Sequence, residues 1–96
     1  MSEDGYAKEY ERWHSARAAW RARVEPADHY LSVEDVEEAV ALIAAQANDA
    51  ETAHGFEDEL MHIVLAAIAA SAGDRPHELA EAVLKVRALD FPRWCS

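Results

Sequence analysis

Basic residues are absent from the middle of this chain. Between Val24 and Asp74 the sequence has no lysine or arginine, and the same span holds 12 of the 19 acidic residues. All nine basic residues lie outside it, and the net charge is −10. Because proteins contact a phosphate backbone through clustered Lys and Arg, this distribution argues against direct binding of nucleic acid. Three interpretations stay open: a solvated face that keeps the protein soluble, a surface for a basic partner (nucleic-acid mimicry included), or contact with the protein's own basic ends.

Other scarcities narrow the class of protein. A single cysteine excludes an internal disulfide and fits a reducing compartment. No apolar run approaches the roughly 20 residues that a membrane span needs. The first ten residues, MSEDGYAKEY, are too polar and acidic for a secretory signal, so we expect a cytoplasmic protein. With only three glycines and three prolines against 21 alanines, the composition favours helices throughout.

Periodicity and capping residues predict a single all-α domain over residues 1–96. Ser32 with Asp35, and Asn48 further on, are expected to cap helices, and Gly73 is expected to end one in the left-handed conformation. Residues 25–31 are expected to form a linker between an N-terminal segment (1–24) and an acidic helical core unit (32–96). The helix of the N-terminal segment is either part of the core or a semi-independent arm. We predict a small bundle of about four helices over residues 4–24, 33–47, 49–72 and 76–89.

The first predicted helix carries an aromatic stripe. Tyr6, Tyr10, Trp13 and Trp20 recur on one face at near-heptad spacing. These rings either cover the core of the other helices or project to pair with a second chain or another partner. Arginines beside the rings also permit stacking on bases, the weakest of the three alternatives. A homodimer is one way to cover more aromatic surface than three short helices bury.

The predicted helix 49–72 holds the side chains that are able to bind a metal. Glu51, His54, Asp58 and His62 fall within an arc of roughly 80° on one face of an ideal helix. Imidazoles and carboxylates one turn apart suit a zinc, manganese or iron ion. Glu-x-x-His pairs also occur in ferritin-like di-metal bundles, for which a dimer would have to supply the second helix. The alternatives are a solvated face, or a network of His–carboxylate hydrogen bonds without an ion.

The last residues predict a tail that docks on the bundle, because Phe91 and Trp94 lie so close together, with Arg93 between them. A short linear motif for a partner is the alternative. Together with Ala53-His54 and Glu57-Asp58, the Phe-x-Arg-Trp-Cys motif at 91–95 resembles a family of small acidic helical proteins from actinobacteria, related bacteria and their phages. The resemblance covers about residues 32–96. It implies a self-contained unit that includes the tail, and it carries no known activity.

The sequence has no Gly-rich phosphate loop, nucleophile elbow or Cys-x-x-Cys motif. We therefore predict a non-enzymatic acidic binding or adaptor protein without a cofactor, which acts on a protein partner or by self-association. The competing hypothesis is a metal-binding helical protein that uses the His/carboxylate face. The expected interaction surface combines the aromatic stripe with acidic side chains: Tyr6, Tyr10, Trp13, Trp20, Glu34, Glu37, Glu38, Glu57 and Asp58.

Overall fold

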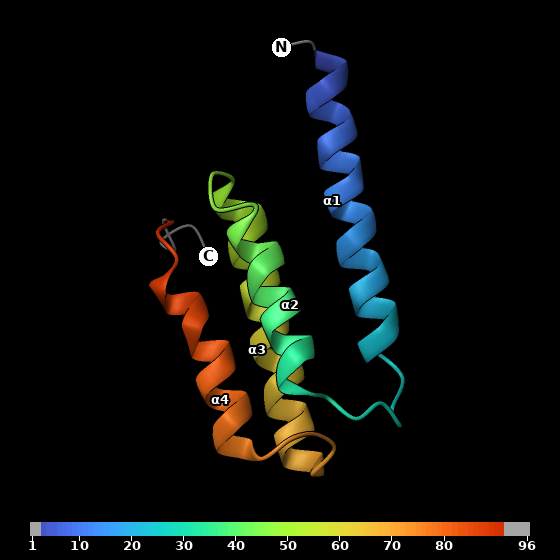
Figure 1. Ribbon diagram of the computed structural model, residues 1–96, viewed down its shortest axis with the longest axis vertical. Helices are drawn as coiled ribbons and strands as arrows, with labels where there is room; N and C mark the ends of the chain where they lie inside the picture. The colour runs from blue at the N-terminus through green and yellow to red at the C-terminus, as the bar shows by residue number, and fades with distance from the viewer. Residues whose placement is uncertain (1–2, 92–96) are drawn as a thin grey trace.

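The computed structural model describes the backbone of residues 3–91 and the side chains of residues 8–91. Its four helices run alternately up and down (Figure 1), which confirms the predicted all-α bundle. The N-terminal part of α1 extends past the hairpin of α2 and α3, and the longest dimension is accordingly 46 Å. The elements are α1 (Glu3–Val24), α2 (Val33–Ala44), α3 (Ala50–Ala70), α4 (Pro76–Leu84) and a short 3-10 helix, η1 (Lys85–Ala88).

Local capping residues set the boundaries of the α2–α3 hairpin. Helix α2 begins with the predicted capping box: the Asp35 amide donates to Ser32 Oγ and the Ser32 amide donates to Asp35 Oδ2, both at 3.1 Å. It ends at Ala44, three residues earlier than predicted, because residues 45–48 form turns. Helix α3 is capped by Asp49 rather than by Asn48. The Asp49 carboxylate accepts hydrogen bonds from the amide and the hydroxyl of Thr52, at 3.3 and 2.9 Å.

The connection between α3 and α4 is joined to the linker through Gly73. The predicted left-handed cap at Gly73 is wrong, since the left-handed residue is Ser71, with φ of 53°. Gly73 is required for a different reason: a Cβ atom there would lie 2.5 Å from the carbonyl oxygen of Leu31. Around this contact the Leu31 amide donates to the Ala72 carbonyl and the Asp74 amide donates to the Leu31 carbonyl, both at 2.9 Å.

Asp74 strengthens the same junction with its side chain. Its carboxylate accepts from the Val33 amide and from the Tyr30 hydroxyl, each at 2.8 Å. Asp74 therefore satisfies an otherwise free amide in the first turn of α2. It does not cap the helix that follows it, because α4 begins with Pro76 and has no side-chain hydrogen bond at its N-cap.

Two tryptophans attach α1 to the rest of the bundle. Trp13 Nε1 donates to the Leu42 carbonyl and Trp20 Nε1 donates to the Asp35 carbonyl, both at 2.8 Å. The donors and the acceptors are each seven residues apart, in opposite chain order, so α1 and α2 are antiparallel. Both indole rings also meet Phe56 of α3 edge-on, with centroids 6.2 and 5.4 Å apart. The C-terminal part of α1 is therefore packed into the core.

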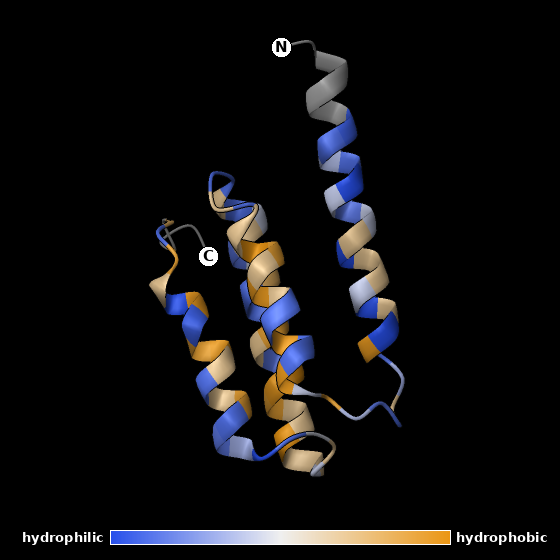
Figure 2. Cartoon of the chain, in the orientation of Figure 1, coloured by the Kyte–Doolittle hydropathy of each residue, from blue (hydrophilic) through white to orange (hydrophobic). Residues whose placement is uncertain are grey.

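The core combines side chains from all four helices and from the linker. Figure 2 shows apolar residues spread along α2, α3 and α4, whereas α1 is mostly hydrophilic outside its few buried positions. None of the helices in the described part has the length and apolar character needed to cross a membrane. The largest fully buried side chains are Trp20, Val36, Ile43, Phe56, Leu60, Val64, Leu79 and Val86.

Candidate interaction groove

The structure does not assemble the predicted metal ligands. His54 Nδ1 lies 3.6 Å from Asp58 Oδ2, but Glu51 and His62 are exposed and make no ion pair among the described residues. No group of three or more His, Cys, Asp or Glu side chains within residues 8–91 is placed to hold a metal ion. Asp58 is 68% exposed, so the surrounding water competes with any ion there. Metal binding stays a prediction that a titration has to test.

Two arginines of α1 form ion pairs with Glu59, the acidic residue next to Asp58 in the sequence. Arg21 Nη2 lies 3.2 Å from Glu59 Oε2 and Arg17 Nη2 lies 3.7 Å from it. Arg17 also lies over the ring of Phe56, 4.5 Å from its centroid, in a cation–π contact. The other oxygen, Glu59 Oε1, is buried and has no hydrogen-bond partner among the described residues.

The expected acidic surface is partly neutralised by the protein's own basic segments. Glu37 pairs with Lys85 at 3.3 Å and Glu38 pairs with Arg23, which also approaches Asp35 at 3.9 Å. Glu34 and Asp58 are exposed as expected. Glu57 does not belong to this surface, because it is only 3% exposed on the core side of α3. The basic residues at both ends of the sequence therefore contact the acidic middle, which was one of the three interpretations.

Among its described side chains, the aromatic stripe of α1 is likewise not an exposed surface. Trp13 and Trp20 are 7% and 1% exposed, because α2 and α3 cover them. Tyr10 is half-buried, and its ring meets His14 edge-on at 4.3 Å. The side chain of Tyr6 lies outside the described part. In the tail Phe91 is buried, and Arg93 and Trp94 lie beyond the described residues.

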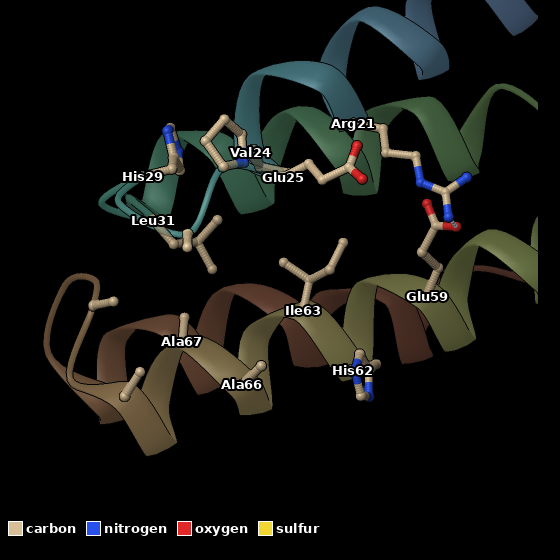
Figure 3. A pocket seen from close by; sticks show the side chains of 14 residues that line it. Arg21, Val24, Glu25, His29, Leu31, Glu59, His62, Ile63, Ala66 and Ala67 are labelled. Carbon is tan, nitrogen blue, oxygen red and sulfur yellow. Dashed lines mark ion pairs between the residues drawn. The ribbon is translucent and has the colours of Figure 1, made fainter.

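A groove of about 490 Å³ separates the end of α1 and the linker from the C-terminal half of α3 (Figure 3). We call it the α1–α3 groove. It lies where α1 has ended at Val24 and the linker leads to α2, while α3 continues to Ala70. On α3 its lining runs from residue 59 to residue 70, which is about 16 Å at 1.5 Å per residue. The groove is lined by Arg21, Val24, Glu25, Pro26, Ala27, His29, Leu31, Glu59, His62, Ile63, Ala66, Ala67, Ala70 and Ala72.

The groove has an apolar floor and a charged rim. Ile63, Ala66 and Ala67 point into it from α3, and Leu31 faces them from the linker (Figure 3). The small alanine side chains leave room for another backbone to approach α3 closely. At the rim Arg21 is paired with Glu59, and the Glu25 side chain lies on the α1 side (Figure 3).

His29 at the rim connects the groove to the start of α2. Its Nε2 lies 2.8 Å from Asp35 Oδ2, the carboxylate that also closes the capping box with Ser32. Burial by itself raises the pKa of Asp35. The hydrogen bonds with His29 and with the Ser32 amide outweigh burial and hold this pKa below its ordinary value. The linker wall of the groove is thus fixed to α2 by an ionised carboxylate.

Sequence reasoning missed this groove. The alanines at positions 66, 67, 69, 70 and 72 indicate a helix by composition alone, although such a run also marks a helix surface with little side-chain cover. Comparisons with known proteins add no ligand or partner: a scan against family models and searches of curated proteins and of solved structures found no match.

Proposed function

We propose that this protein is a non-enzymatic binding module that receives an amphipathic helix of a partner protein in the α1–α3 groove. The observation that carries the proposal is the uncovered, alanine-lined side of α3. It is about three helical turns long, which matches the spacing of anchors at i, i+3 or i+4, and i+7 on a bound helix.

The physical gain comes from apolar surface that the chain leaves accessible. Ala66 and Ala70 are exposed and Ile63 and Ala67 are half-buried, so a helix laid over them would remove apolar area from water at about 25 cal/mol per Å². A second copy of this chain is a poorer occupant, because each copy brings a net charge of −10.

A substitution that fills the groove tests the proposal. Ala66→Phe places a large ring on the groove floor at an exposed helical position, where the fold tolerates it. The control is Ala19→Phe, at another exposed alanine, which lies on α1 outside the groove. A fluorescein-labelled 18-residue peptide of Leu, Ala and Lys, with one apolar face, serves as the probe in fluorescence anisotropy.

We expect Ala66→Phe to weaken binding of this peptide at least about tenfold, equivalent to ~1.4 kcal/mol, and Ala19→Phe to leave it unchanged. Both variants should keep the melting temperature of the parent within about 2 °C, because neither position is buried. Equal affinity of the parent and both variants would place the binding site elsewhere and end the proposal.

A further inference from the structure

We infer that the partner helix is basic, with Lys or Arg beside its apolar face and one of these cations at Glu25. This inference rests on the proposed function of the α1–α3 groove and adds the chemistry of its occupant. It is carried by the charges that the groove leaves unneutralised.

Glu25 is the available anion at the rim. It is exposed, it lines the groove, and it makes no ion pair among the described residues. Among the described residues that line the groove, Arg21 is the one Lys or Arg, and its guanidinium is already paired with Glu59 at 3.2 Å. A cationic side chain on the partner would therefore meet an unpaired carboxylate rather than a competing protein cation.

The helix termini add to the negative potential. Because α1 and α3 both run antiparallel to α2, their C-termini, at Val24 and Ala70, point toward the same end of the bundle, and α3 continues past the end of α1 (Figure 1). The C-terminal end of a helix carries a partial negative charge that favours a nearby cation. The last turn of α3 has no basic residue to offset it, and the basic residues of the last turn of α1, Arg21 and Arg23, are paired with acids.

The charge of the whole chain acts in the same direction. With a net charge of −10 it attracts a basic segment over a distance and repels an acidic one. This long-range attraction has no preferred location, so it has to be separated experimentally from the contact at Glu25.

Two peptides and two charge variants make that separation. The peptides share one Leu/Ala face and carry either Lys or Glu on the other. Glu25→Gln removes the rim charge. Glu81→Gln, at an exposed position of α4 away from the groove, changes the net charge by the same amount. Anisotropy is measured with labelled peptide at low salt and again with added NaCl, and a thermal melt checks each variant.

We expect the Lys peptide to bind and the Glu peptide to fail. Glu25→Gln should weaken the Lys peptide about two- to fivefold, as for an exposed ion pair. Glu81→Gln should weaken it less, and added salt should reduce the difference between the two variants. Equal losses of affinity for the Lys peptide in both variants would show that only the net charge of the protein matters, and they would overturn the inference.

The remaining outcomes distinguish this inference from the proposed function. If the Glu peptide binds as tightly as the Lys peptide and Ala66→Phe blocks it, the groove is a helix site but its partner is not basic. If neither peptide binds, the proposed function fails and the inference fails with it.

Discussion

The two glycines that have described surroundings should respond in opposite ways to alanine. At Gly73 an added Cβ would lie 2.5 Å from the Leu31 carbonyl oxygen and 3.2 Å from Leu79 Cδ1, so the backbone has to move. That movement disrupts two backbone hydrogen bonds with Leu31, each worth about 1 kcal/mol net, and displaces Asp74 from the Val33 amide. We expect Gly73→Ala to lower the free energy of unfolding by about 2–3 kcal/mol.

Gly55 provides the matched control, because it lies on the exposed side of α3, where an added Cβ would meet nothing within 4 Å. Alanine there removes the helix penalty of glycine and should stabilise the protein by about 0.5–1 kcal/mol. For a domain of this size about 1 kcal/mol moves the melting temperature by roughly 4–8 °C. Urea unfolding and thermal melts followed by circular dichroism measure both effects. A Gly73→Ala variant within about 0.5 kcal/mol of the parent would refute the close contact between the linker and the α3–α4 connection.

Three further results are expected. A chain that begins at Leu31 should be unfolded by circular dichroism, because the loss of Trp13 and Trp20 removes roughly 7–12 kcal/mol of burial; a folded remainder would make α1 a separable arm. The pKa of Asp35 is lower in the folded than in the unfolded protein. The ionised carboxylate therefore contributes fully to the free energy of unfolding above the unfolded pKa, near 3.8, and this contribution is lost as the pH falls through the folded pKa. In urea titrations the stability difference between the parent and Asp35→Asn should therefore shrink as the pH falls below about 4; a difference that stays constant down to about pH 2.5 would contradict this. Thermal melts with zinc, manganese or ferrous iron test the metal hypothesis: a rise of several degrees that disappears in His54→Ala/His62→Ala would establish the site, and an unchanged melting temperature would refute it.

The parts of the fold that depend on neighbouring residues could be predicted from the sequence. The capping box of Ser32 and Asp35 involves only residues 32–35, so a local sequence pattern is enough to predict it. The seven-residue spacing of Trp13 and Trp20 likewise indicates that both indoles lie on one face of their helix. The end of α3 could not be predicted in this way. A local rule assigns Gly73 to a left-handed cap, whereas its contact is with Leu31, more than 40 residues away.

The candidate site was the least predictable part. Helical spacing correctly groups His54 with Asp58, but spacing alone does not reveal that Arg17 and Arg21 approach the adjacent Glu59 from another helix. Spacing also places Glu57 beside the buried stripe, one turn from Ala53 and Leu60, but its charge predicts an exposed side chain, whereas it is buried. The α1–α3 groove arises from the direction in which the linker leaves α1, and that direction is set by tertiary contacts rather than by any motif.

Backbone amide chemical shifts would locate the binding surface most directly. In a titration of the ¹⁵N-labelled protein with the Lys peptide, we predict the largest changes at Glu25, Ile63, Ala66, Ala67 and Ala70, with saturation at one peptide per chain. Changes concentrated on the outer faces of α2 and α4, or spread evenly over the acidic residues, would contradict a helix-binding groove between α1 and α3.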